Sequence, residues 1–280
     1  MCNSNQSTCG RTWYCAGPFW DPECKKFFDE FKQRIKETTM VNSDHVDECE
    51  PVMTCGDSVF MPGHYEVNFP EIKKSYDVSS FKRVLTQILY LDTTAGIDGK
   101  NIVVYVPGYD LGTMFEVGYY ISQNYAPGNA RSLNYNILRR QMILHKTDEK
   151  MNEAIEKLME FLDKQESKNW VNVDRVAIVD KSIRVIDQKF DEVNCLAIRM
   201  DNSNEDPFNA MVAGAAYAMN IPFITYSLNE TKSNTMMIGA SLGHVKTNNR
   251  NLDRDVTNFY KNLSKNVWTD DNINYAKDIK

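Results

Sequence analysis

The sequence predicts an α/β protein built on a doubly wound parallel sheet of the Rossmann or flavodoxin-like kind, present in two copies. Residues 100–108 (KNIVVYVPG) form a nearly continuous apolar run rich in β-branched residues, which is typical of a parallel strand buried on both faces. Runs of this kind alternate with helical patterns in both halves of the chain, and this alternation favours a parallel sheet covered by helices. With 280 residues, the chain is long enough for two such units.

The first half opens with an expected strand, tight turn and helix. The apolar run TWYCAGPFW (12–20) is broken by a glycine and a proline, and aromatic and aliphatic residues then recur at helical spacing over 24–37. Residues 40–75 contain several prolines and glycines and are expected to form a long loop. The pattern over 78–92 predicts a helix that ends in an aspartate, ahead of the strand at 100–108.

A charged helical segment separates the two halves. Its sequence is DEKMNEAIEKLMEFLDKQESK (148–168), and the strand and helix patterns that follow it again alternate. We therefore divide the chain into a first α/β unit (11–147), a charged helical linker (148–169), a second α/β unit (170–262) and a C-terminal tail (263–280).

The two halves resemble each other in one stretch. NIVVYVPGYDLGTMFEVGYY and NCLAIRMDNSNEDPFNAMVAGAAY each run from a strand to an aspartate and then into a helix, with a glycine eight residues past the aspartate (Gly118 and Gly214). On this register Glu116 falls opposite Val212. We infer an internal duplication in which the second copy has lost its buried carboxylate.

Composition excludes several classes of function. A net charge of -6 gives no basic field for nucleic acid or anionic lipid, so small molecules are the expected partners. The seven cysteines form no C-x-x-C pair, and the four histidines show no ligand spacing, so we expect no metal and no cofactor. No apolar run approaches the ~20 residues of a membrane span, and the polar start lacks the apolar core of a signal peptide. A cytoplasmic protein with reduced thiols is the expectation.

Three carboxylates are expected at the same edge of the first sheet. In a doubly wound sheet, ligands bind outside the carboxyl ends of the strands, where Asp110 and Gly112 follow the strand at 100–108. Glu116 lies in an otherwise apolar helix, and burying an unpaired carboxylate costs several kcal/mol or raises its pKa. Together with Asp92, these residues suit glycosyl transfer, in which one carboxylate attacks the anomeric carbon and another handles the proton.

These residues resemble the nucleoside 2-deoxyribosyltransferase family. The resemblance lies in YCAGPF at the first turn, in the aspartate at the end of a helix, and in D-x-G-x-x-x-E-x-G at 110–118. It covers residues 12–126 and, more weakly, 175–245. It implies an enzyme that cleaves the N-glycosidic bond of 2'-deoxynucleosides and passes the sugar to another base through a covalent glutamyl intermediate, with net retention.

The resemblance also implies roles for individual residues. Glu116 matches the nucleophile, Asp92 the aspartate that manages the proton of the base, and Asp110 the aspartate that orients sugar and base. Either Trp13 or Tyr14 would stand beside Glu116, since strand alternation lets only one face the site, and the Ala-Gly register slightly favours Trp13. The expected substrate-binding residues are Trp13, Tyr14, Gly17, Phe19, Gly112, Met114, Asn234 and Ser241.

In this family a neighbouring subunit completes each site, so the resemblance implies a homo-oligomer. SNTMMIGAS (233–241) resembles the family's stretch after its last strand, although Gly243 stands at the expected amide position. Our hypothesis is that the second half plays the neighbour, contributing from around Asn234, Ser241 or His244.

Structural roles remain as alternatives for each residue. Glu116 could reach water or an arginine, Asp110 could serve only as a helix cap, and Asp92 could be a turn residue. Two other functions also stay open. One is an N-glycoside hydrolase of deoxynucleosides or deoxynucleoside 5'-monophosphates, and the other is a non-catalytic nucleotide-binding or sensing protein.

Overall fold

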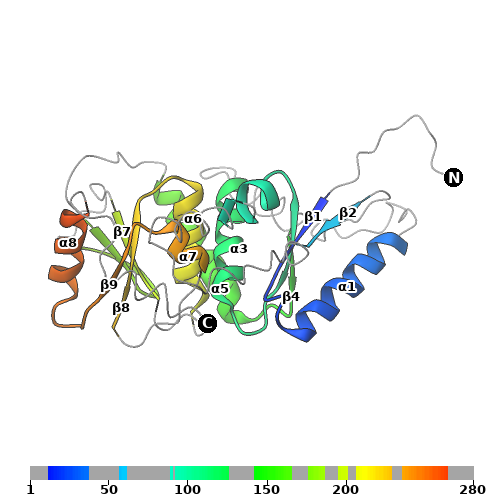
Figure 1. The fold of residues 1–280 in the computed structure, drawn as a ribbon, viewed down its shortest axis with the longest axis horizontal. Helices are drawn as coiled ribbons and strands as arrows, with labels where there is room; N and C mark the ends of the chain where they lie inside the picture. The colour runs from blue at the N-terminus through cyan, green and yellow to red at the C-terminus, as the bar shows by residue number, and fades with distance from the viewer. Residues whose placement is uncertain are drawn as a thin grey trace, which may run out of the picture.

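The structure is a computed structural model with two sheets, one parallel and one mainly parallel, that enclose a shared layer of helices (Figure 1). It describes residues 12–37, 57–61, 89–90, 92–125, 142–165, 176–186, 195–200, 206–228 and 235–263. In Figure 1, α1 lies outside the first sheet, α8 lies outside the second, and α3, α5, α6 and α7 lie between the sheets. The predicted α/β class with parallel, helix-flanked strands is confirmed.

The first sheet has the strand order β2-β1-β3-β4, with all described pairs parallel. Its strands are β1 (Thr12–Ala16), β2 (Ser58–Phe60), β3 (Asn101–Tyr105) and β4 (Met142–His145). Helix α1 (Pro22–Glu37) covers the outer face, and α3 (Leu111–Asn124) the inner face. The strand β2 lies within the segment that the sequence predicted to be a long loop. It has three residues, and it forms where this segment pairs with β1.

The second sheet has the order β6-β5-β7-β8-β9, and only β6 among these strands is antiparallel to its neighbour. Its strands are β5 (Val176–Val179), β6 (Ile183–Val185), β7 (Cys195–Arg199), β8 (Phe223–Ser227) and β9 (His244–Lys246). The helices α6 (Pro207–Ala218) and α7 (Thr235–Ala240) cover the inner face. The corresponding strands of the two halves, β2-β1-β3-β4 and β6-β5-β7-β8, therefore follow the same order.

The expected linker helix is part of the core. Helix α5 (Glu149–Gln165) buries an apolar face that includes Leu158, Phe161 and Leu162, and it packs against α6. One continuous apolar cluster joins the inner faces of both sheets to the helices between them, and we call it the central core. Because α5 contributes side chains to the central core, it is a structural part of the fold as well as a connection between the two halves.

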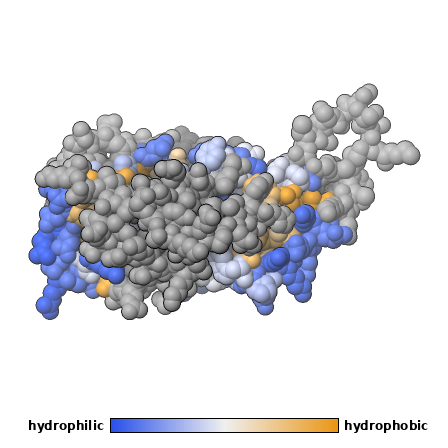
Figure 2. Space-filling view, viewed as in Figure 1, coloured by the Kyte–Doolittle hydropathy of each residue, from blue (hydrophilic) through white to orange (hydrophobic). Residues whose placement is uncertain are grey.

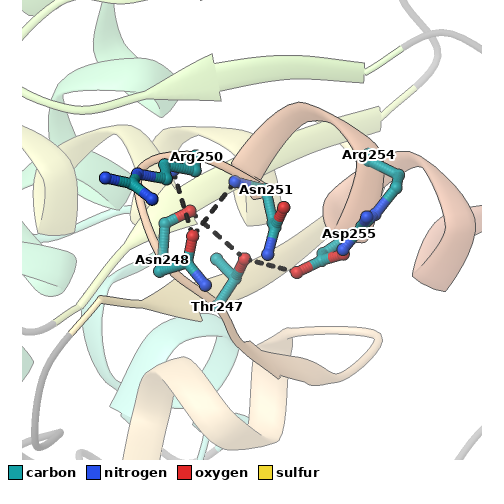
Figure 3. A network of polar contacts seen from close by, with 6 residues as sticks. All are labelled: Thr247, Asn248, Arg250, Asn251, Arg254 and Asp255. Carbon is teal, nitrogen blue, oxygen red and sulfur yellow. Dashed lines mark hydrogen bonds and ion pairs between the residues drawn. The ribbon is translucent and has the colours of Figure 1, made fainter.

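Helix α8 (Leu252–Asn262) closes the outer face of the second sheet. The Asn248 side chain accepts from the backbone N–H groups of Arg250 and Asn251 at 3.0 and 3.1 Å, which shapes the turn into the helix (Figure 3). Thr247 then donates to Asp255 at 2.7 Å, tying the strand end to the first helical turns. Hydrophilic side chains of α1 and α8 gather at the two ends of the molecule (Figure 2).

The two halves meet where α3 crosses α6, at a reciprocal pair of glycines. A Cβ atom added to Gly118 would lie 1.9 Å from the carbonyl oxygen of Met211, and one added to Gly214 would lie 1.9 Å from that of Phe115. Each glycine therefore touches the residue three positions before its counterpart, as in a contact across a two-fold axis. This is the arrangement expected of two related units, and duplication itself stays a prediction.

The glycine contact predicts an unusual effect of alanine. At an ordinary helical position Gly→Ala stabilises by about 1 kcal/mol, but in Gly118→Ala the new methyl group meets the rigid backbone of α6. We expect the free energy of unfolding to fall by about 2 kcal/mol or more, measured by chemical denaturation. Gly99→Ala is the comparison, since Gly99 has open space around it and its positive φ of 71° alone should lower the free energy of unfolding by about 1 kcal/mol. A Gly118→Ala protein as stable as the parent would contradict the close contact.

Candidate active site

The predicted carboxylate Glu116 lies inside the protein on α3, with only 7% of its surface exposed. Its position depends on where the helix begins. Asp110 caps α3, since its Oδ2 accepts from the Thr113 N–H at 2.9 Å and from the Thr113 hydroxyl at 3.0 Å. The cap fixes the first turn directly after β3, and Glu116 then points inward from the second turn.

Tyr14 is the direct partner of Glu116. Its hydroxyl donates to Glu116 Oε1 at 2.5 Å, and its side chain is fully buried. Tyr14 lies on β1, paired with Ile102 of the neighbouring strand β3, and its ring stacks on Phe60 of β2 at 5.8 Å. The first sheet therefore holds a hydrogen-bond donor rigidly against the carboxylate of α3.

The environment of Glu116 opposes its ionisation. Burial is the main cause of its raised pKa, the negative charge of Asp92 adds to the effect, and Asp110 contributes further. The hydrogen bond from Tyr14 acts in the other direction, because it stabilises the charged form. Glu116 is thus a desolvated carboxyl group whose charge is supported by one dedicated donor.

Asp92 supplies a second perturbed carboxyl group. It lies at the start of the π-helix η3 (Thr93–Ile97), and burial raises its pKa to about 7. Electrostatic coupling links it with both Glu116 and Tyr14. Near neutral pH such a pair can hold one proton between two carboxyl groups, which provides an acid beside a nucleophile.

The strand register corrects the choice between Trp13 and Tyr14. Trp13 faces α1 on the opposite side of the sheet, where its ring packs edge-on against Phe31 at 5.8 Å and its Nε1 donates to Asp57 at 3.0 Å. Because side chains alternate along a strand, placing Tyr14 against Glu116 excludes Trp13 from that position. The preference for Trp13 beside the carboxylate was wrong.

Gly17 and Phe19 also contact the outer helix layer. A Cβ atom on Gly17 would lie 2.7 Å from Cys24 Sγ and 2.9 Å from the ring of Phe28, so a small residue is needed for α1 to pack. Phe19 stacks on the same Phe28 ring at 5.2 Å. The described contacts give both residues a packing role, and their expected role in substrate binding stays a prediction.

The remaining predicted binding residues have different positions. Gly112 and Met114 are buried on α3, with Met114 in the central core. Ser241 is buried after α7, a helix that packs against α3, and Asn234 lies outside the described residues. The packing of α7 against α3 brings this part of the second half close to the helix of Glu116.

The corresponding strand ends in the second half contain a different polar network. Arg199 forms an ion pair with Asp180 at 2.9 Å, and the Asn209 side chain bridges the backbone of Lys181 and Arg199. Val212 stands where the first half has Glu116. These described side chains bond to one another and to backbone, and the position matched to Glu116 carries no carboxylate.

His244 lies at the edge of the second sheet. Its Nδ1 is 3.0 Å from the Thr225 hydroxyl and its Nε2 is 3.1 Å from the Ser227 hydroxyl. All three side chains are buried. The hypothesis that this region completes the first-half site stays a prediction for His244, as it does for Ser241.

Within the described ranges, no group of three or more His, Cys, Asp or Glu side chains is arranged to hold a metal ion. None of the helices in the described part of the chain combines the length and the apolar character needed to cross a membrane.

Sequence reasoning did not single out the tyrosines around η3. Tyr119 of α3 donates to Asp98 Oδ1 at 2.8 Å, and Tyr217 of α6 packs against the Tyr119 ring with 6.1 Å between ring centroids. Tyr119 belongs to the same apolar helix as Glu116, but nothing in the local pattern indicates its partner across 21 positions of chain. The Asp98 hydrogen bond joins the segment of Asp92 to α3.

The raised pKa of Asp92 predicts a pH-dependent stability. The pKa is about 7 in the folded protein against an ordinary 3.8, so this group's stabilisation is complete below about pH 4 and is lost as the pH rises through 7. Asp92→Asn removes that loss. The quantity compared is the free energy of unfolding of the variant minus that of the parent. We expect this difference to be about 2 kcal/mol larger at about pH 8 than at about pH 5, which means that the variant gains stability over the parent as the pH rises. Asp29→Asn on the exposed face of α1 is the control, and equal pH profiles for parent and Asp92→Asn would contradict the burial of Asp92.

Comparison of the chain with protein-family models, with curated proteins and with solved structures found no match.

Proposed function

We propose that this protein transfers 2-deoxyribose between nucleobases by cleaving the N-glycosidic bond of 2'-deoxynucleosides. The observation that carries the proposal is the buried Glu116 carboxylate, held by Tyr14 at 2.5 Å with the perturbed Asp92 beside it. The resemblance of the motif at 110–118 to nucleoside 2-deoxyribosyltransferases supports the same reaction.

In the first step, a Glu116 oxygen attacks C1' of the nucleoside. A C–O ester bond forms, the C1'–N bond breaks, and the leaving base takes the bonding electrons while Asp92 gives it a proton. This step needs Glu116 ionised and Asp92 protonated. Burial raises the pKa of both carboxyl groups, to about 7 for Asp92, and the Tyr14 hydrogen bond opposes the rise at Glu116. Protonation of Asp92 removes the negative charge that further opposes ionisation of Glu116, so the two protonation states required by this step favour each other.

In the second step, a nitrogen of another base attacks C1' from the same face. The ester bond breaks, Glu116 leaves as a carboxylate, and Asp92 takes the proton from the incoming base. Two inversions give net retention at C1'. Asp92 returns to its protonated form, so one cycle leaves the protein unchanged.

Burial contributes to this chemistry electrostatically. The transition state resembles an oxocarbenium ion, and an adjacent carboxylate stabilises this cation more strongly in a dry environment than in water. Tyr14 holds the carboxylate in place before the charge develops. Asp110 uses its Oδ2 to cap α3, and the family resemblance supports a further role in orienting sugar and base.

We also infer a cytoplasmic setting and assembly into a homo-oligomer. Buried free thiols at Cys15, Cys24 and Cys195 support a reducing compartment. The oligomer is proposed from the family resemblance alone.

Glu116→Gln tests the proposed nucleophile, because glutamine keeps the side-chain shape and can still accept from Tyr14 but cannot form the ester. The protein is incubated with 2'-deoxyinosine, with and without adenine, and the bases are separated by chromatography. We expect adenine-dependent formation of 2'-deoxyadenosine, reduced by about 10³-fold or more in the variant. Glu30→Gln on the exposed face of α1 is the matched control and should keep full activity.

The same assay separates the rival functions. Release of hypoxanthine without a new nucleoside would replace the transferase with a hydrolase. Binding without turnover across purine and pyrimidine donors, unchanged by Glu116→Gln, would instead indicate a nucleotide-binding protein.

Tyr14→Phe tests the role of the hydrogen bond to Glu116. Because this bond lowers the pKa of the carboxyl group, its loss should raise that pKa and move the acidic limb of the kcat/KM profile to higher pH. At pH values below the parent's optimum we expect about tenfold lower kcat/KM. Tyr105→Phe is the control, since the Tyr105 hydroxyl bonds Glu23 on the α1 side. An unshifted acidic limb in Tyr14→Phe would count against this role.

A further inference from the structure

The segment that follows Asp92 folds as the π-helix η3. The Asp98 N–H donates to the Thr93 carbonyl at 3.2 Å and closes the wide helical turn. At the start of η3, the Thr93 hydroxyl donates to the Leu89 carbonyl at 2.6 Å. Turns of π-helix are rare and are frequently found at functional sites. Because Asp92 comes directly before this turn, its position depends on the contacts that hold η3.

A hydrogen bond from α3 holds the far end of η3. The Tyr119 hydroxyl donates to Asp98 Oδ1 at 2.8 Å, and α3 packs against η3. Burial and this bond to Asp98 raise the pKa of Tyr119 to about 12, so the hydroxyl keeps its donor hydrogen near neutral pH. Lys100 also lies near Asp98, whose charge acts on the Lys100 ammonium group. A hydrogen bond to a carboxylate is stronger than one between neutral groups, so Tyr119 ties Asp98 to α3.

The same face of α3 carries Glu116. Glu116 and Tyr119 are three residues apart, so their side chains are neighbours along one side of the helix. Glu116 lies close enough to Asp92 for the two charges to interact. Tyr119 contacts Asp98, at the other end of η3. One rigid helical face therefore meets the chain on both sides of η3, and it sets the separation of the Glu116 and Asp92 carboxyl groups.

Helix α6 of the second half packs against Tyr119. The Tyr217 ring lies 6.1 Å from the Tyr119 ring and 6.0 Å from the Phe115 ring, measured between centroids. Tyr119 also follows Gly118, where α3 touches the backbone of α6, and it is only 4% exposed. Dense packing of this kind limits the rotation of the Tyr119 ring, so its hydroxyl stays directed at Asp98.

We propose that Tyr119 is a positioning residue, which sets the place of Asp92 relative to Glu116 by holding the end of η3. The inference rests on the proposed function, in which Asp92 moves the proton of the base. Tyr119 needs no contact with the substrate for this role, because it acts through Asp98 and the π-helical turn. The packing of α6 on Tyr119 gives the second half a part in the reaction, although Val212 stands at the position matching Glu116.

Loss of the Tyr119 hydroxyl should alter the titration of Asp92. Among the described residues, the titratable groups that face Asp92 are Glu116 from α3 and Tyr14 from β1. If the end of η3 opens, water reaches Asp92, and the desolvation that raises its pKa weakens. The pKa of Asp92 then falls. The alkaline limb of the activity profile requires protonated Asp92, so it moves to lower pH.

The test compares Tyr119→Phe with Tyr125→Phe, in the full chain and with 2'-deoxyinosine and adenine. Tyr125 follows α3, is also buried, and donates to Asp163 Oδ1 of α5 at 2.9 Å. Each change therefore removes one hydrogen bond from a tyrosine to an aspartate, but only Tyr119→Phe removes one at η3. We expect Tyr119→Phe to lower kcat about tenfold with KM within about twofold, and to shift the alkaline limb to lower pH. Tyr125→Phe should change neither property.

Amide hydrogen exchange reports on η3 without any substrate. Opening of the turn breaks the bond from the Asp98 N–H to the Thr93 carbonyl. Exchange over 92–98 should therefore be about fivefold faster or more in Tyr119→Phe and unchanged in Tyr125→Phe. Equal exchange in the two variants would show that the Tyr119 hydroxyl does not hold η3.

Two substitutions at Asp98 make the test specific. Asp98→Asn removes the charge that acts on Lys100 but keeps an acceptor oxygen, so its kcat should stay within about threefold of the parent. Asp98→Ala removes the acceptor and should reproduce the pH shift of Tyr119→Phe. Because Asp98 is exposed, Asp98→Ala tests the same bond without a change in the central core.

The double variant Tyr119→Phe with Asp98→Ala decides whether the two residues act together. It should be no worse than the more impaired single variant, because both substitutions remove one interaction. Additive losses would show that Tyr119 does not act through Asp98 and would overturn the inference.

The two proposals fail in distinguishable ways. If the parent protein turns over no nucleoside, the proposed function fails, and exchange over 92–98 still decides whether Tyr119 holds the segment. If the parent is active and Tyr119→Phe matches Tyr125→Phe in kcat, alkaline limb and exchange, the positioning role is excluded while the proposed function stands.

Discussion

The backbone contact between α3 and α6 is the constraint on which the rest of the structure depends. Two glycines, Gly118 and Gly214, let each helix touch the other's main chain, and a methyl group at either would meet a carbonyl oxygen at 1.9 Å. Such close approach brings both inner sheet faces and four helices into one central core. The helix that carries Glu116 is consequently covered on both sides, by its own sheet and by the second half.

That coverage explains the electrostatics of the candidate site. Glu116 and Asp92 both have raised pKa values because protein replaces the water that would stabilise their charges, and the charge of Asp92 raises the pKa of Glu116 further. Tyr14 counters part of this effect at Glu116 by donating to the ionised form. The fold therefore gives the Glu116 and Asp92 carboxyl groups different surroundings, since Tyr14 donates to Glu116. Different surroundings of two carboxyl groups are a common basis for assigning one as the acid and the other as the nucleophile.

Several differences between expectation and structure have local causes. The pattern of the first strand predicted that either Trp13 or Tyr14 faces inward, but the choice depends on how β1 pairs with β3, and the sequence of β1 alone does not contain that register. The strands β2, β6 and β9 have three residues each, too short for a periodic signal, and they exist because a neighbouring strand offers its edge. Helix α5 reads as a charged linker, yet its apolar face completes the central core.

The sequence by itself determined the α/β class and placed Glu116 inside an apolar helix that follows Asp110, because these features depend on hydrophobic periodicity. It left the helix cap as one of two roles for Asp110, and the structure shows the cap. Only the tertiary structure decided the partners of those groups. Tyr14 meets Glu116 across 102 positions of chain, and Tyr119 meets Asp98 across 21. Such pairs, and the burial that shifts their pKa values, follow from the packing of sheets and helices, which no local pattern encodes.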